Sequence, residues 1–204
     1  MPTGEYLLSD PHDGTPLAVE RFRCARGPVG WRYVATRHLA EAPDGPAVGR
    51  VDVTVDDRWR QLRVEITAGG WLVRGGLGGD GLTWLRRAAD GTGEVEEYVR
   101  PAAGFAGASP ALLVCAARMA ALAPEGQADL PVIVLTPPGL AARTARQRWR
   151  LDGRTAHRSE DGAEVLVDDF TLLDLDLGTG EPVHLADDVV LAAPGVDLAE
   201  LDPG

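Results

Sequence analysis

Hydrophobic and polar residues alternate along most of this chain, as they do in β-strands that bury one face. Val51, Val53 and Val55 alternate with polar residues, and a second alternating run covers 62–67. Two neighbouring runs with a period of two predict a hairpin that reverses near Asp57. Comparable runs predict strands at 17–23, 31–39, 71–74, 82–87, 95–100, 130–136, 145–151, 165–167, 173–177 and 189–192. The run at 130–136, LPVIVLT, is the most apolar, and we expect it to be a central strand.

One segment departs from the β pattern. Residues 109–122 read SPALLVCAARMAAL, which predicts a helix capped by Ser109, with Pro110 at its first position. Arg118 is the one charge in this segment, and a helix that is apolar nearly all round must be buried on most sides. A single such helix needs a curved sheet, or another chain, to wrap it. We therefore expect an α+β, mainly β fold, in which a strongly curved antiparallel sheet wraps this helix. The expected organisation is a single domain, 1–193, followed by an acidic C-terminal tail, 194–204.

The composition excludes several classes of function. The 204 residues carry a formal net charge of −11, and all twenty basic residues are arginines. An acidic chain is unsuited to nucleic acid, because phosphate binding needs a concentrated positive surface. The chain shows neither a secretory signal nor an apolar stretch long enough to span a bilayer, so we expect a cytoplasmic protein.

The short motifs favour structural roles over chemistry. The glycine-rich run at 75–81, GGLGGDG, lacks the Lys and Ser or Thr of a phosphate loop, so it predicts a hairpin turn. Cys24 and Cys115 form neither a disulfide framework nor a zinc site, and Cys115 falls inside the apolar helix. The histidines have no metal-ligand spacing, so we expect no metal and no cofactor. They are His12, His38, His157 and His184.

The tryptophans are the best candidates for a ligand surface, because an indole offers a broad apolar face and one N–H donor. Most of the five will serve the core. Met119 and Leu113 join the candidates because they lie on the predicted helix. The full set of candidate ligand-binding residues is Trp59, Trp71, Trp84, Leu113, Met119 and Trp149. The arginines at 146, 148 and 150 share one strand face, which favours a solvated face neutralised by neighbouring carboxylates.

Three short motifs stand out in the middle of the chain. They are the run 56–60, DDRWR, followed by Val64 and Ile66; the run 79–81 with Trp84; and 147–149, QRW. Together they resemble the bacterial glycolipid-binding family of half-barrel proteins. The resemblance covers about residues 48–152. The chain lacks that family's Gly-Cys-x-Asp and Asn-Thr-Leu-Pro segments and has Ala88–Gly91 and Phe105–Pro110 instead. The resemblance implies a curved antiparallel sheet that cups helical segments and binds a ligand on its apolar concave surface, beside the helix.

These observations lead to one hypothesis and two rivals. We expect non-catalytic binding of an amphipathic or lipid-like molecule, such as a glycolipid. Burial of apolar surface in the cup would drive this binding. In the first rival, the helix completes its burial against a second copy, which gives a homodimer without a cavity. In the second, an enzyme has dispersed site residues, and His38, His157 or His184 converges with a carboxylate in a pocket. A helix that fills the cup completely would leave no room for a ligand.

Overall fold

The computed structural model describes residues 1–28, 30–107, 109–158 and 164–202. The first half of the chain contains β1 (Thr3–Ser9), β2 (Pro16–Gly27), β3 (Gly30–Leu39), β4 (Gly49–Val55), β5 (Gln61–Ala68), β6 (Trp71–Gly78), β7 (Gly81–Ala88), β8 (Glu96–Arg100) and β9 (Gly104–Gly107). The second half contains α1 (Pro110–Ala120), β10 (Gln127–Thr136), β11 (Ala141–Arg158), β12 (Glu164–Asp174), β13 (Thr179–Ala186), β14 (Val189–Ala193) and β15 (Val196–Asp202).

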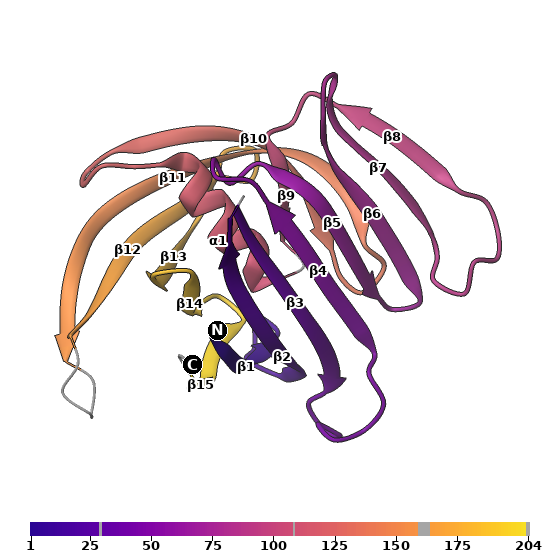
Figure 1. Ribbon diagram of the computed structural model, residues 1–204, viewed down its shortest axis with the longest axis horizontal. Coiled ribbons are helices and arrows are strands. Elements are labelled where there is room, and N and C mark those ends of the chain that lie inside the picture. Colours follow the sequence, from indigo (N-terminus) through magenta and orange to yellow (C-terminus); the bar gives the residue numbers. More distant parts are fainter. Residues whose placement is uncertain (29, 108, 159–163, 203–204) are drawn as a thin grey trace.

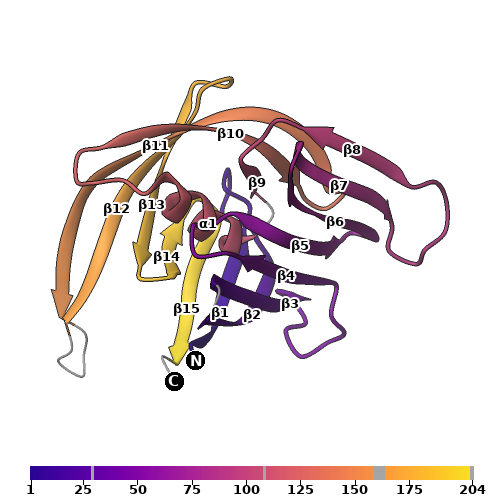
Figure 2. The ribbon, with the colours of Figure 1, turned by 45° about the horizontal axis from the view of Figure 1, so that its top comes forward.

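The fifteen strands of the described residues form one sheet, in the order β8-β7-β6-β5-β4-β3-β2-β1-β15-β14-β13-β12-β11-β10-β9. Figures 1 and 2 show that this sheet is strongly curved and open. Over the described ranges the protein is thus mainly β, with one helix and one large curved sheet, which confirms the sequence prediction at that level. Neighbouring strands of the described residues pair antiparallel, as predicted, except at one pair: β9 runs parallel to β10. The connection between them is α1, and parallel neighbours need such a crossover.

Strand β10 is not central, as its apolar sequence had indicated, but lies second from the edge. Its composition follows from burial on both faces. Ile133 and Leu135 belong to the main core, whereas Val132, on the opposite face, packs with Ala106 and Ala145 in a small second cluster.

The sequence patterns missed β1, β9, β13 and β15. The last of these lies in the segment expected to be an acidic tail. Residues 196–198 and 200–202 pair with β1, and Val196 and Leu198 pack against the core. The sheet therefore continues beyond residue 193 despite the acidic exposed positions. The alternation expected through 173–177 ends at Asp174, after which the chain turns into β13.

A ladder of aromatic rings crosses the first strands on their buried face. Tyr6 stacks on Phe22 with ring centroids 4.7 Å apart, and Phe22 stacks on Tyr33 at 5.4 Å. The ladder continues through Trp31 to Trp59, with centroids 5.7 and 5.3 Å apart. Large rings on neighbouring strands thereby fix the register of β1–β3 and cover the end of the core at the β4–β5 turn.

Buried charge anchors the beginning of α1. Glu20 on β2 is fully buried and accepts hydrogen bonds from Tyr33 Oη at 2.5 Å, Arg37 Nε at 2.5 Å and Ser109 Oγ at 3.1 Å. Ser109 Oγ also accepts from the Ala111 amide at 3.3 Å, which confirms it as the helix cap. The burial of Tyr33 and the charge of Glu20 raise the pKa of the tyrosine hydroxyl well above its ordinary value. One carboxylate therefore joins β2, β3 and the start of the helix.

A second ion pair anchors the other end of α1, where Arg118 is in the last turn. Arg118 Nη1 donates to Asp168 Oδ2 on β12 at 2.9 Å, and its Nη2 donates to the Asp187 carbonyl oxygen. Arg154 Nε bonds the other oxygen of Asp168 at 2.5 Å. Burial alone would raise the pKa of Asp168, but the hydrogen bonds from Arg154 and Arg118 hold it below its ordinary value.

The helix packs against β9, β10 and β14, and seven of its eleven residues are buried. Its buried residues belong to the same core as Tyr33, Ile66 and Leu185 from distant parts of the sheet. In Figures 1 and 2, α1 lies on the inner side of the arc formed by β10–β13.

The two outer strands of the sheet, β8 and β9, are consecutive along the chain and are joined by residues 101–103. The side chain of Gln61, at the start of β5, hydrogen-bonds to the free edge of β9 as a neighbouring strand would. Its Oε1 accepts from the Phe105 amide at 2.7 Å, and its Nε2 donates to the Phe105 carbonyl oxygen at 3.0 Å. Both residues are almost completely buried, at 0% and 1% exposed. The side chain thus satisfies backbone groups that an edge strand would otherwise leave unpaired.

Candidate functional site: a cleft at the seam of the sheet

A cleft of about 320 Å³ lies where the two ends of the sheet face each other. Strands β7 and β8 form one wall, and β10 and β11 form the other. The lining residues are Trp84, Arg86, Glu96, Tyr98, Arg100, Ile133, Ala141, Ala142 and Thr144. We call this site the seam cleft. Its volume falls at the small end of the range typical of small-molecule sites.

Trp84 and Tyr98 form the aromatic wall of the seam cleft. They are cross-strand partners on β7 and β8, and their rings stack with centroids 5.0 Å apart. Phe105 meets Trp84 edge-on at 5.7 Å and supports it from the core. The Trp84 indole N–H is buried and has no hydrogen-bond partner among the described residues. A buried donor without a partner is costly, and a polar atom of a ligand could satisfy it.

The opposite wall is apolar. Ile133 on β10 faces the cleft, and its register partner on β11 is Thr144. Ala142, two residues before Thr144, is exposed and adds a small apolar surface beside it. The small side chains on β11 leave space opposite the two stacked rings. The two walls together offer a slot for a flat or chain-like apolar group.

Charged side chains stand at the rim of the seam cleft. Arg86 donates from Nε and Nη2 to the Gly139 carbonyl oxygen at 3.2 and 2.9 Å, so it bridges the two walls. Its guanidinium also lies 3.6 Å from the Trp71 ring centroid and 3.2 Å from Glu96 Oε2. Hydrogen bonds from Tyr98 and Arg86 lower the pKa of Glu96, and the bond to Glu96 raises the pKa of Tyr98.

Of the two arginines at the rim, Arg100 makes the fewer polar contacts. Its Nη1 donates to the Val99 carbonyl oxygen at 2.8 Å, and no carboxylate of the described residues pairs with it. The rim therefore carries two arginines and one carboxylate, which favours an anionic group on a ligand.

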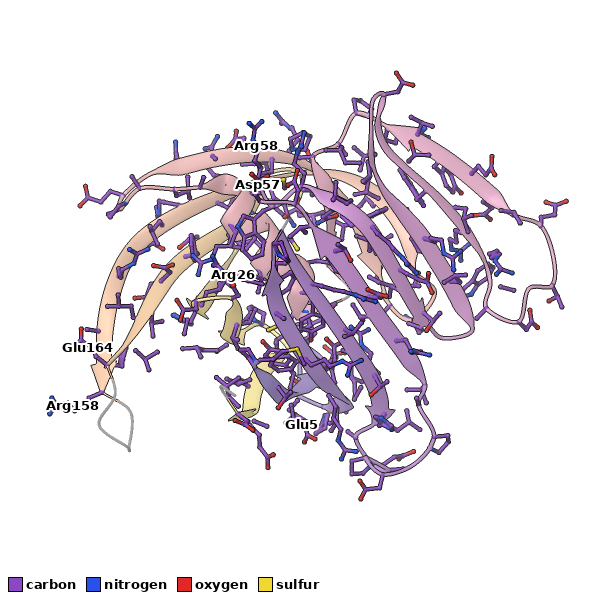
Figure 3. The ribbon with its side chains drawn as sticks, viewed as in Figure 1. Glu5, Arg26, Asp57, Arg58, Arg158 and Glu164 are labelled. Carbon is purple, nitrogen blue, oxygen red and sulfur yellow. The ribbon has the colours of Figure 1, made fainter. Side chains whose placement is uncertain are left out.

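Two of the four histidines meet in a second, shallow pocket. Its lining residues are His157, Arg158, Val165, Val167, Asp169, His184, Leu191 and Ala192 on β11–β14. His184 Nδ1 lies 2.7 Å from Asp169 Oδ1, and Thr155 Oγ1 donates to the other oxygen of that carboxylate at 3.2 Å. Because a carboxylate accepts, Nδ1 is the donor in this hydrogen bond, and in the neutral ring Nε2 then carries the lone pair. Figure 3 shows Arg158 and Glu164 at the far end of the β11–β12 hairpin.

The other two histidines lie elsewhere. His38 Nδ1 is 2.9 Å from the Gly45 carbonyl oxygen, and His12 is exposed in the β1–β2 turn. The described residues contain no group of three or more His, Cys, Asp or Glu that could hold a metal ion. Burial raises the pKa of the Cys24 thiol to about 11 and that of Cys115 still further. A protonated buried thiol is a poor nucleophile, so neither cysteine offers covalent chemistry.

The six sequence-predicted ligand residues do not converge in the structure. Trp84 lines the seam cleft, and the Trp71 ring packs against the guanidinium of Arg86 at its rim. Trp149 is fully buried and meets Phe170 edge-on at 5.7 Å. Trp59 is half-buried in the β4–β5 turn at the end of the aromatic ladder, with a positive φ of 62°. Leu113 and Met119 are half-buried on α1 and line neither the seam cleft nor the shallow histidine pocket.

Sequence reasoning missed most of the seam cleft. Tyr98, Arg100, Ala142 and Thr144 carry no motif, and they come together only because the sheet brings its two ends face to face. The interpretation of the arginine face at 146, 148 and 150 as a solvated, neutralised surface agrees with the structure. Arg148 pairs bidentately with Asp129 at 2.6 and 2.9 Å, and Arg150 pairs with Asp152. That face is neutralised by neighbouring carboxylates, as its alternation indicated.

Comparisons with known proteins give a distant structural match and indicate no function. No family model matches the sequence, and no curated protein matches it. A search of solved structures finds the crystal structure of a DUF1089 family protein from Pseudomonas aeruginosa, with a TM-score of 0.46 and 17% sequence identity. The match covers 95% of this chain and 89% of that chain. The neighbour's description names neither a ligand nor a reaction, so the resemblance to the glycolipid-binding family stays a prediction. No helix of the described residues is long and apolar enough to cross a bilayer.

Proposed function

We propose that this protein binds a small amphipathic, lipid-like anion, and that the seam cleft is its binding site. The observation that carries the proposal is the stacked Trp84–Tyr98 pair, which faces a wall of small and apolar side chains under a rim with two arginines. An apolar chain or ring would lie between the walls, and an anionic end would meet Arg100. Apolar burial would drive binding, at roughly 25 cal/mol for each Å² removed from water.

This proposal moves the ligand away from the surface beside the helix. We infer that the curved sheet wraps α1 and that the helix, with seven buried residues, fills the concave side at that point. No residue of α1 lines the seam cleft or the shallow pocket at His184. The seam cleft supplies instead what the hypothesis requires of a site: apolar walls and a few convergent polar groups. No bond of the ligand is made or broken in this role.

The experiment that tests the proposal is calorimetric titration with decanoate, a carboxylate with an apolar chain. We expect saturable binding at a one-to-one ratio, with acetate as an anion that lacks the chain and binds far more weakly. Ala142→Trp places a large ring in the cleft and should abolish binding. Ala156→Trp is the matched control, because Ala156 is exposed on the same strand, β11, outside the cleft.

Arg100→Gln separates the two parts of the site. It should weaken decanoate binding by about tenfold or more, since a hydrogen bond to a charged group contributes about 1.5–3 kcal/mol. Absence of saturable binding, or equal binding by Ala142→Trp and Ala156→Trp, would refute the proposal. Circular dichroism of both tryptophan variants verifies that each retains the fold.

A second candidate function rests on the Asp169–His184 hydrogen bond. We infer that this pair could support general-base hydrolysis of an apolar ester in the shallow pocket. Water would attack the ester carbonyl carbon, its proton would pass to His184 Nε2, and the departing alkoxide would take that proton. Hydrolysis of p-nitrophenyl butyrate should then be lost in His184→Ala and retained in His12→Ala, which alters an exposed turn residue. Equal rates in the two variants would remove this candidate.

A further inference from the structure

A groove of about 600 Å³ crosses the outer face of β1–β5, opposite the aromatic ladder. Five arginines line it, in a protein whose formal net charge is −11. They are Arg21, Arg23, Arg32, Arg50 and Arg63, together with Thr3, Thr36, Thr67, Asp52 and Glu65 among the other lining residues. We propose that this groove binds a phosphate or sulfate group, and that Arg23 and Arg50 hold it.

Most of the positive charge in the groove is already neutralised by neighbouring carboxylates. Arg21 pairs with Glu5 at 2.9 Å and with Asp44 at 3.1 Å. Figure 3 labels Glu5 on this part of the sheet. Arg32 forms a two-pronged pair with Asp52, at 3.1 and 2.8 Å. These pairs hold their guanidinium groups in place and leave little free charge for a ligand.

The third pair follows the same pattern. Arg63 lies 3.1 Å from Glu65 Oε2, and Arg74 from β6 lies 2.7 Å from the same oxygen. Arg23 and Arg50 differ from these arginines. Both are exposed, and neither forms an ion pair with any carboxylate of the described residues. An incoming anion can therefore bind these two cations without displacing an internal partner.

The strand register places the two free cations on either side of β3. Arg23 on β2 is the partner of Val34, and Arg50 on β4 is the partner of Thr36. Val34 and Thr36 point to the same face, two positions apart, so both arginines stand on that face with β3 between them. Neighbouring strands are about 4.8 Å apart, which separates the two backbones by about 10 Å. Two long side chains can converge over β3 from that distance.

The chemistry of the lining residues selects the ligand class. Guanidinium groups bind tetrahedral oxyanions with paired N–H donors, and phosphate offers three acceptor oxygens. Thr36 and Thr67 flank Arg50 on the adjacent strands β3 and β5 and can donate hydroxyl hydrogen bonds to the remaining oxygens. The group recognised is thus a phosphate or sulfate, either on a soluble molecule or on a lipid headgroup.

Calorimetric titration with inorganic pyrophosphate tests the site directly. We expect saturable binding that weakens as the salt concentration rises, because exposed charges are screened. Arg23→Gln and Arg50→Gln should each weaken binding by about tenfold or more. Arg146→Gln is the matched control: this exposed arginine on β11 lies outside the groove, 3.9 Å from Asp176. All three substitutions are at exposed positions, so each variant should fold.

A vesicle arm separates the two sources of the anion. The protein is sedimented with phosphatidylcholine vesicles, with or without phosphatidic acid. Sedimentation only with the vesicles that contain phosphatidic acid, and its loss in Arg50→Gln, would assign the groove to a lipid headgroup. Pyrophosphate binding without vesicle binding would assign it to a soluble phosphate. Absence of both, or binding that survives the Arg23→Gln, Arg50→Gln double variant, would overturn the proposal. Ala142→Trp, which blocks the seam cleft, should leave pyrophosphate binding unchanged, so the two sites can fail independently.

Discussion

Two buried glutamines should respond in opposite ways to the same substitution. Gln61 makes two hydrogen bonds to the Phe105 backbone, at 2.7 and 3.0 Å, and is 0% exposed. Gln147 on β11 is 8% exposed, and its Oε1 is buried without a partner among the described residues. Methionine has a similar length and no hydrogen-bonding amide. Gln61→Met should therefore destabilise the protein, and Gln147→Met should leave its stability unchanged or increase it.

The size of each effect follows from what the substitution leaves behind. Gln61→Met leaves the N–H and C=O of Phe105 buried without partners, and each costs about 1–3 kcal/mol. The free energy of unfolding should fall by about 2–6 kcal/mol. Gln147→Met removes a polar atom that gains nothing from its burial, so the change should lie between zero and about 2 kcal/mol of added stability.

Urea denaturation followed by tryptophan fluorescence measures both changes. Gln127→Met is the control, because Gln127 is exposed at the start of β10. Amide exchange at Phe105 gives an independent measure and should accelerate in Gln61→Met only. A Gln61→Met variant no less stable than Gln127→Met, or a Gln147→Met variant that loses as much stability as Gln61→Met, would contradict this prediction.

Three further changes follow from the buried polar groups. Asp168→Asn should reduce the loss of stability at acid pH. The lowered pKa of Asp168 stabilises the wild-type fold above about pH 4, and this stability is lost as the pH falls through the folded-state pKa. The urea midpoints of wild type and variant should therefore converge at low pH, and divergence would contradict this. Glu20→Gln should lower the free energy of unfolding by about 3–5 kcal/mol, because it breaks a buried ion pair with Arg37. A change below about 0.5 kcal/mol in urea denaturation would contradict this. Cys24 and Cys115 should react with a thiol reagent at pH 8 only after unfolding, since burial raises both pKa values, and rapid reaction of the native protein would show that this is wrong.

The sequence predicted the strands that bury one face and the helix that has a cap. Val51, Val53 and Val55 alternate over β4 because one face of the sheet is solvated, and Ser109 and Pro110 mark the start of α1. Strand β9 was beyond this reasoning, because four residues are too few for a period and its partner, β10, is parallel. Strand β15 was missed because its exposed positions are acidic and its apolar positions are few.

The seam cleft was largely invisible for a different reason. Trp84 was a sequence candidate because of its size and N–H group, but nothing near it in the chain pointed to Ile133 or Thr144. Those residues face Trp84 and Tyr98 only through the overall curvature of the sheet, which brings β7–β8 opposite β10–β11. Long-range curvature arises from the twist of every strand together, so no local pattern encodes it.

The indole resonance of Trp84 tests the central claim most directly. In a ¹H–¹⁵N spectrum each of the five tryptophans gives one indole signal, and Trp84→Phe assigns that of Trp84. The buried Trp84 N–H has no hydrogen-bond partner among the described residues, and neither has that of Trp149 on β11. On titration with decanoate, we expect the Trp84 signal to shift until it saturates, while the Trp149 signal stays in place. A stationary Trp84 signal, or equal shifts for both indoles, would contradict binding at the seam cleft.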